Sequence, residues 1–203
     1  MVITPLSLVG LVLVYLVGAV PMGYLVARVL RVDIRAHGSG NIGATNVLRT
    51  LGKGPAAITL LLDMAKGYTA VWIALTLGPE PWWGGAGAAL AVIGSGWPVF
   101  LGFRGGKGMA TGLGAFLHLM PLAVLPSVLV WVAVAATFRY ISLASLTAAL
   151  CVPIGAALLG RYHWSGAAAA LVVALIVVLR HRDNVARLLS GTERKLGERV
   201  SAS

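Results

Sequence analysis

Residues 109–138 read MATGLGAFLHLMPLAVLPSVLVWVAVAATF, a run without any aspartate, glutamate, lysine or arginine. A helix needs roughly 20 apolar residues to cross about 30 Å of hydrocarbon. The run is therefore either one long helix or two short helices that turn back near Pro121. One helix or two changes the number of membrane crossings by one. Every later segment would then lie on the opposite side of the membrane.

The basic residues on either side of this run decide between the two possibilities. Arg104 and Lys107 precede it, and the segment that begins at Arg180 is rich in Lys and Arg. Cytoplasmic segments of membrane proteins carry an excess of these residues. Both basic segments lie on one side only if the chain crosses an even number of times between them. Two further apolar stretches follow Arg139, so 109–138 must contribute two helices.

The composition of the whole chain agrees with a membrane protein. Apolar residues make up 59% of the 203 residues, charged residues only 11%, and the net charge is +10. We predict an all-α integral membrane protein with one transmembrane domain, 1–203, and a basic cytoplasmic tail, 181–203. About seven helices, some of them short, would form a single bundle with the N-terminus outside and the C-terminus in the cytoplasm. The predicted spans are Leu6–Leu30, Pro55–Leu77, Gly84–Gly102, Met109–Met120, Pro121–Phe138, Ser142–Leu159 and Ser165–Leu179.

The basic loop after the first span, Arg31–Gly54, contains GSGNIG at 38–43. This matches the dinucleotide fingerprint G-x-G-x-x-G, and Asp63 lies about 20 residues beyond it, where a ribose-binding acid would be expected. A dinucleotide fold needs a strand before the glycines and a βαβ unit around them. Long apolar stretches flank this loop instead, so we reject the nucleotide-binding interpretation.

The same loop has the composition of a phosphate-binding site. Glycines let successive backbone N–H groups point into one hollow, to which Ser, Thr and Asn add uncharged donors. Arg49 can bind phosphate through two N–H groups, and Ala44–Leu51 can form a short helix whose N-terminus faces the hollow. A plain turn-rich loop is the alternative. The candidate phosphate-binding residues are Gly38, Ser39, Gly40, Asn41, Gly43, Thr45, Asn46 and Arg49.

A second glycine-rich segment, GFRGGKGMATG at 102–112, also carries cations. It is not a Walker A loop, because its glycines are spaced too closely and Lys107 is followed by glycine where Ser or Thr is required. ATP is therefore not implied. We predict a second phosphate site here, with a flexible turn at the membrane edge as the alternative. Its candidate residues are Arg104, Gly105, Gly106, Lys107 and Gly108.

Polar residues near other span ends could complete the site. His181 and Asn184 are three apart in RHRDNVARLL and would share one helix face, although a basic tail often only anchors a protein to anionic lipid. Ser142 and Ser145 begin a span beside Arg139, although serines also pack between membrane helices.

Charged residues inside a span are the remaining clue. Asp63 and Lys66 can pair along one helix, either as a structural ion pair or as part of the site. Cys151 is the only cysteine and the acidic residues are scattered, so we expect no metal and no cofactor.

Two cationic glycine-rich segments at one membrane face suggest that two phosphate groups meet there. The helices could hold an acyl chain, which favours a transfer between a phosphorylated polar molecule and an apolar one, and no nucleic-acid partner. A transporter of organic phosphates is the alternative, but it should place its charges near mid-membrane and show paired halves. A lipid-binding scaffold would not need loops so rich in Gly, Ser, Thr and Asn.

Five segments also carry a family resemblance: GSGNIGATNVLR, LLDMAKG, GFRGGKGMAT, RYISLASL and RHRDNVARLLSGTERK. In their order and spacing, from Gly18 nearly to the C-terminus, the chain resembles the PlsY family of integral-membrane glycerol-3-phosphate acyltransferases. One position departs from the family pattern. Ser95, in GSGWP, stands where the family commonly has histidine.

The resemblance implies a reaction, its partners and a location. The sn-1 hydroxyl of glycerol-3-phosphate would attack acyl-phosphate, giving lysophosphatidic acid and phosphate, in the bacterial plasma (inner) membrane with the active site facing the cytoplasm. His181 and the phosphate of the donor are the two candidates for the base, and we favour the phosphate. Ser142 is expected among the binding residues, and the lipid bilayer surrounds the protein. The implied catalytic residues are Ser39, Arg49, Lys107, His181, Asn184 and Ser145.

Overall fold

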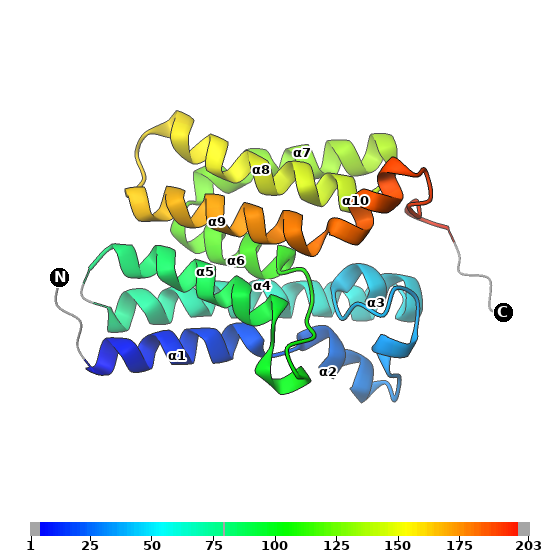
Figure 1. Ribbon diagram of the computed structural model, residues 1–203, viewed down its shortest axis with the longest axis horizontal. Helices are drawn as coiled ribbons and strands as arrows, with labels where there is room; N and C mark the ends of the chain where they lie inside the picture. The colour runs from blue at the N-terminus through cyan, green and yellow to red at the C-terminus, as the bar shows by residue number, and fades with distance from the viewer. Residues whose placement is uncertain (1–4, 79, 199–203) are drawn as a thin grey trace.

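The computed structural model describes residues 5–78 and 80–198, and this part of the chain contains helices and loops but no strand. Figure 1 shows an elongated bundle whose longer helices run along one axis. The helices are α1 (Pro5–Ala19), α2 (Met22–Val29), α3 (Ala44–Leu51), α4 (Lys53–Leu77), α5 (Trp82–Gly96), α6 (Met109–Leu119), α7 (Pro121–Phe138), α8 (Ile141–Leu159), α9 (Trp164–Arg180) and α10 (Arg182–Leu189), with 3₁₀ turns η1 (Ile34–Ala36) and η2 (Val99–Leu101).

Several of these helices are long and apolar enough to cross a membrane. Four segments pass this test alone, Lys53–Leu77, Trp82–Leu101, Pro121–Phe138 and Ile141–Leu159, and two bent pairs, α1 with α2 and α9 with α10, raise the number to as many as six among the described residues. α6 is apolar but has only 11 residues. The prediction of an all-α membrane bundle is confirmed. The ends of the predicted domain, residues 1–4 and 199–203, lie outside the described residues.

The run 109–138 forms two helices, as the distribution of charge predicts. α6 ends at Leu119, Met120 leaves the helical region with φ −146° and ψ 60°, and α7 begins at Pro121. α6 packs closely against α4, because a Cβ atom on Gly114 would lie 1.9 Å from the carbonyl oxygen of Met64. Small residues allow such close approach of membrane helices. α6 is thus a short helix covered by its neighbours.

The first predicted span differs from the structure in one respect. Leu6–Leu30 is not one helix, because the chain breaks at Val20 and Pro21 and α2 is bent by 44° from α1. Proline lacks the N–H that would continue the helix ladder. Lys66 Nζ donates to the carbonyl oxygen of Val20 at 2.8 Å and pairs with Asp63 at 2.8 Å. The predicted ion pair is therefore present, and it also satisfies the helix break.

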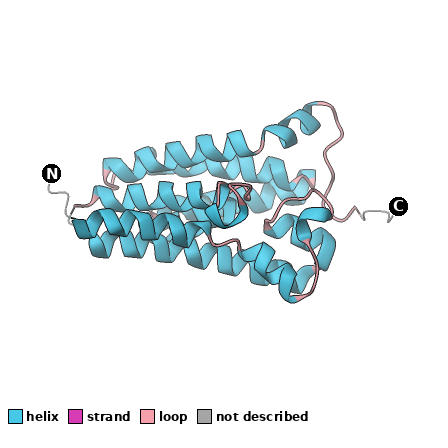
Figure 2. Cartoon of the chain, turned by 60° about the horizontal axis from the view of Figure 1, so that its bottom comes forward, coloured by secondary structure: helices cyan, strands magenta, loops and turns pink. Residues whose placement is uncertain are grey.

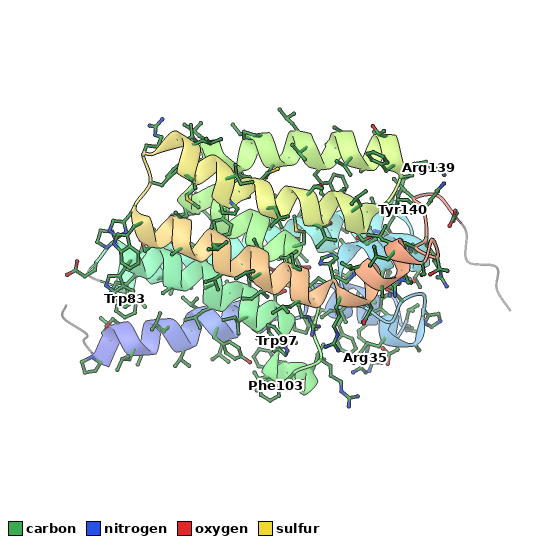
Figure 3. The ribbon with its side chains drawn as sticks, turned by 45° about the horizontal axis from the view of Figure 1, so that its top comes forward. Arg35, Trp83, Trp97, Phe103, Arg139 and Tyr140 are labelled. Atoms are coloured by element: carbon green, nitrogen blue, oxygen red, sulfur yellow. The ribbon has the colours of Figure 1, made fainter. Side chains whose placement is uncertain are left out.

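One end of the bundle gathers the shorter elements. α2, α3 and α10 lie together at the right of Figure 1, and Figure 2 shows the same end with its connecting loops. Arg139 and Tyr140 lie toward this end in Figure 3 and Trp83 lies at the other. Both glycine-rich segments belong to the half of the bundle that carries α2, α3 and α10.

Candidate active site

A single cavity of about 1000 Å³ joins the three segments that the sequence analysis singles out. The loop 38–46, the segment 106–108 and the α9–α10 junction all contribute to its wall. An apolar part of the wall comes from α4, α6, α7 and α8, through Leu60, Leu113, Val128, Trp131, Val132 and Ala148. Asp63 and Lys66 of α4 also line the cavity, so the predicted ion pair belongs to its wall. The cavity can therefore hold a molecule with a charged end and a long apolar end.

Asn46 holds the first glycine loop in shape. Its Oδ1 accepts from the N–H of Ser39 at 2.9 Å, and its Nδ2 donates to the carbonyl oxygens of His37 and Asn41 at 3.0 and 2.8 Å. Gly38 has φ +60°, and a Cβ atom there would lie 2.2 Å from Asn46 Oδ1. Glycine is therefore required where the loop passes this side chain. The amide of Asn46 organises the loop rather than pointing free into the cavity.

The start of α3 supplies donors to the cavity. Gly43 precedes the helix, and its N–H donates to Asn41 Oδ1 at 2.9 Å. Ala44 and Thr45 follow in the first turn and line the cavity. The first N–H groups of a helix have no acceptor within the helix, so they are available to an anion. Arg49, one turn further, is half-buried and also lines the cavity.

Lys107 brings a second cation to the same cavity. Its Nζ donates to Asn184 Oδ1, which connects the second glycine segment to α10. Burial, partly offset by the nearby carboxylate of Glu193, lowers the pKa of Lys107 to about 8. Burial deprives the Lys107 ammonium group of the water that would stabilise its charge. A bound anion stabilises that charge instead, so burial favours anion binding. The residue is therefore suited to hold a phosphate.

The lowered pKa of Lys107 predicts a pH effect on anion binding. Affinity for inorganic phosphate should fall as the pH rises through about 8, because the free protein loses the Lys107 charge there. Lys107→Arg stays charged at this pH, so its phosphate affinity should not decline over the same interval. Titration calorimetry between about pH 7 and 9.5 measures both proteins. An equal decline in both would assign the titration to another group.

Glu193 organises the third segment. It is buried, and its Oε1 accepts from Ser142 Oγ and from Asn184 Nδ2, both at 2.7 Å. Its Oε2 accepts from Arg187 Nε at 2.7 Å. Because Asn184 donates to Glu193, its carbonyl oxygen faces Lys107. The carboxylate thus determines how Asn184 presents itself to the cavity.

His181 lies between α9 and α10 and is buried. Its Nδ1 is 2.8 Å from the carbonyl oxygen of Val177, so Nδ1 carries the proton and the lone pair lies on Nε2. Burial, with a further contribution from the charge of Lys107, lowers the pKa of His181 to about 4. The imidazole is therefore neutral near pH 7. It can accept a hydrogen bond from a hydroxyl in the cavity.

Ser145 marks the boundary between the polar and the apolar wall. It is buried in α8, lines the cavity, and accepts a hydrogen bond from Trp131 Nε1 at 3.3 Å. Trp131 belongs to the apolar wall on α7. Its indole N–H is therefore satisfied without water, which suits a place where a ligand changes from polar to apolar.

The structure brings most of the predicted site residues together. Three of them lie outside the cavity wall: Gly40, Arg104 and Gly105, of which Arg104 is exposed. Sequence reasoning gave no site role to several cavity residues that the structure adds. These include Glu193, Arg180, Arg187 and Ser95. Their positions in the chain carry no signal of their own, except that Ser95 departs from a family pattern.

A family model described as glycerol-3-phosphate acyltransferase matches residues 8–191. The chain belongs to this family. The glycerol-3-phosphate acyltransferase of Thermus thermophilus is 46% identical over 192 residues, covering 95% of this chain and 96% of the relative. That of Geobacter sulfurreducens is 48% identical over 182 residues, covering 89% and 93%.

Two solved structures share the fold of this acyltransferase. The crystal structure of PlsY, an integral membrane glycerol 3-phosphate acyltransferase, in its glycerol 3-phosphate form has a TM-score of 0.88 at 37% identity and covers 94% of this chain and 96% of its own. The lysophosphatidic acid form has a TM-score of 0.87 at 36% identity, covering 94% and 95%. The resemblance stated from the motifs is thereby confirmed.

Ser95 takes a local role in this member of the family. It is buried, lines the cavity, and its Oγ accepts from Thr111 Oγ1 at 3.1 Å. Its backbone carbonyl oxygen accepts from the N–H of Gly106 at 3.0 Å. The serine therefore ties α5 to α6 and to the second glycine segment.

Proposed function

We propose that this chain transfers an acyl group from acyl-phosphate to the sn-1 hydroxyl of glycerol-3-phosphate, giving lysophosphatidic acid and inorganic phosphate. The observation that carries the proposal is the composition of one cavity. Two cationic glycine-rich segments share it with an apolar wall. A headgroup phosphate, a leaving phosphate and an acyl chain all find matching surroundings there.

Electrostatic stabilisation of the leaving phosphate is the main task of the cations. Lys107, Arg49 and the first N–H groups of α3 line the same cavity. Fixed donors in a site that excludes water lower the free energy of developing charge without reorganising. Two substrates held in register also avoid the entropy cost of their encounter, worth on the order of 7–11 kcal/mol in ideal cases.

The proton follows a route through the donor. As the glycerol hydroxyl oxygen attacks the carbonyl carbon, the C–O bond to phosphate breaks and a new ester C–O bond forms. The hydroxyl proton passes to a phosphate oxygen of the donor, which leaves as inorganic phosphate. His181 is neutral and buried, and its Nε2 can accept from the hydroxyl and orient it, with Asn184 beside it. Ser39, Thr45 and Ser145 supply further hydroxyl groups at the cavity wall.

We also propose that the cavity faces the cytoplasm of the bacterial inner membrane. Arg49, Lys107 and Arg180, which belong to the three basic segments, line one cavity. An excess of Lys and Arg marks the cytoplasmic side. The N-terminus would then lie outside and the C-terminus inside.

One assay separates the enzyme from the alternative, a transporter of organic phosphates. Purified protein in detergent should release phosphate from acyl-phosphate only when glycerol-3-phosphate is present, and should form lysophosphatidic acid in equal amount. With acyl-CoA as donor, the product should form at least about 100-fold more slowly, because the leaving group is then a thiolate and not a phosphate that the cationic segments can stabilise. A transporter would give no product in detergent, and would instead take up labelled glycerol-3-phosphate into proteoliposomes.

A further inference from the structure

Arg180, the last residue of α9, makes two contacts with the second glycine segment. Its Nη2 donates to the carbonyl oxygen of Gly105 at 2.8 Å, and its Nε donates to the carbonyl oxygen of Gly106 at 3.0 Å. These are consecutive peptide groups directly before Lys107. The guanidinium thus holds the backbone that carries the catalytic lysine.

Other contacts fix the guanidinium and the segment in turn. The Cζ of Arg180 lies 5.1 Å from the centre of the Trp97 ring, a cation–π geometry. Trp97 is held from α1, because its carbonyl oxygen accepts from Tyr15 Oη at 2.8 Å. The N–H of Gly106 donates to the carbonyl oxygen of Ser95 at 3.0 Å. Three helices, α1, α5 and α9, therefore meet at this segment, and Figure 3 shows Trp97 beside it.

The backbone of the second glycine segment is tightly packed at Gly105. A Cβ atom on Gly105 would lie 2.3 Å from Pro98 Cδ and 2.4 Å from the carbonyl oxygen of Ser95. The backbone of Gly105 is therefore pressed against the end of α5. Arg180 approaches the segment from α9 and donates to the carbonyl oxygens of Gly105 and Gly106.

We infer that Arg180 is a positioning residue for the proposed reaction, which sets the place of Lys107 by holding the carbonyl oxygens of Gly105 and Gly106. Two of its donor atoms are engaged by backbone, so it acts through the segment. It also joins this segment to His181, the next residue in the chain, and to Asn184 in the first turn of α10. The Arg180 side chain thus fixes the position of Lys107 relative to His181 and Asn184, which orient the acceptor substrate.

Arginine is needed for this task because of its shape. A planar guanidinium can donate to two neighbouring carbonyl oxygens and stack on an indole at the same time. Lysine offers a single ammonium on a flexible stem and cannot do both. The charge of residue 180 is therefore less important than its geometry.

The experiment compares Arg180→Gln and Arg180→Lys with the exposed control Arg161→Gln. We expect kcat/KM to fall about tenfold in both Arg180 variants, mostly through kcat, and the control to match the unmodified protein. Affinity for inorganic phosphate, measured by calorimetry without turnover, should weaken by a similar factor. Recovery of normal kcat/KM in Arg180→Lys would overturn the inference, since charge alone would then suffice.

A double substitution tests whether Arg180 acts through Lys107. Arg180→Gln placed in a Lys107→Met background should cost less than about twofold further, because the residue that it positions is already gone. A further tenfold loss would show that Arg180 binds substrate directly, and would overturn the inference.

The outcome is distinguishable from failure of the proposed function on which the inference rests. If the unmodified protein forms no lysophosphatidic acid, the proposed function fails. If the unmodified protein forms it and Arg180→Gln has unchanged kcat/KM and phosphate affinity, only the positioning role fails. A variant whose unfolding midpoint falls by more than about 10 °C is replaced by Trp97→Leu, for which the same fall in kcat/KM is expected.

Discussion

Lys107→Met should lower kcat/KM for glycerol-3-phosphate acylation by about 10³. The methionine side chain has nearly the length of lysine but no charge, so the cavity keeps its shape and loses the cation that we propose to face the leaving phosphate. Lys107 is held by Asn184 on α10 and is half-buried. A positive charge in such a place stabilises a developing phosphate charge far more than one in water does. Steady-state kinetics in detergent measure the loss.

The matched control is Lys53→Met at the exposed start of α4. It removes the same charge and should leave kcat/KM within about twofold. Because burying a charged lysine reduces the free energy of unfolding, Lys107→Met should not lower the unfolding midpoint. A loss in kcat/KM below about tenfold would contradict the role of Lys107 in holding the leaving group.

Local signals predicted much of the fold. Ala44–Leu51 is helical over the predicted range because a glycine-rich loop precedes it and Gly52 follows it. The turn at Pro121 followed from the parity of crossings between basic segments, which is a property of the whole chain. Some helix ends differ by one or two residues, as for α9, where Trp164 and Arg180 extend the predicted span. The predicted span Gly84–Gly102 differs more, because α5 ends at Gly96 and the 3₁₀ turn Val99–Leu101 follows Pro98. The break at Pro21 was visible as a proline, but its stabilisation by Lys66 was not.

Contacts between distant segments could not be predicted from the sequence. Glu193 and Ser142 are 51 positions apart, and Arg180 and Gly106 are 74 apart. No spacing rule links residues at such separations, because loops and helix packing decide where they meet. Asn46 illustrates a related limit, since a polar residue in a glycine loop looks the same whether it faces a ligand or the backbone of its own loop.

Glu193→Gln should lower kcat/KM by about 10². The oxygen of glutamine can still accept from Ser142 and Asn184, but its NH₂ group then faces the Arg187 guanidinium, and two donors repel. The substituted side chain has to turn, and either choice leaves a donor without its acceptor. The cost should be about 2 kcal/mol of unfolding free energy, because Arg187 is partly exposed and its pairing is screened.

The expected loss of turnover in Glu193→Gln comes from a change in the orientation of Asn184. Its amide is oriented by donating to Glu193, which leaves the carbonyl oxygen toward Lys107. If the amide turns over, its NH₂ group faces the ammonium instead, and Lys107 moves away from its place. Kinetics should therefore show a fall in kcat, together with a fall in the unfolding midpoint of about 4–8 °C for a chain of this length.

The charge of Glu193 also predicts the acid limit of the unmodified protein. Burial alone would raise the pKa of Glu193, but hydrogen bonds from Ser142, Asn184 and Arg187 outweigh it and lower the pKa below the usual value. A carboxyl group with a lowered pKa contributes stability above its unfolded pKa of about 4.3 and loses it as the pH falls through the lower folded value.

The unfolding midpoint of the unmodified protein should therefore decline below about pH 4.5, and Glu193→Gln should lose this part of the decline. Glu198→Gln serves as the control and should behave like the unmodified protein, because Glu198 is exposed and its Oε2 accepts from the backbone N–H of Lys195. Equal acid sensitivity in Glu193→Gln and in the unmodified protein would mean that this carboxylate does not hold the third segment in place.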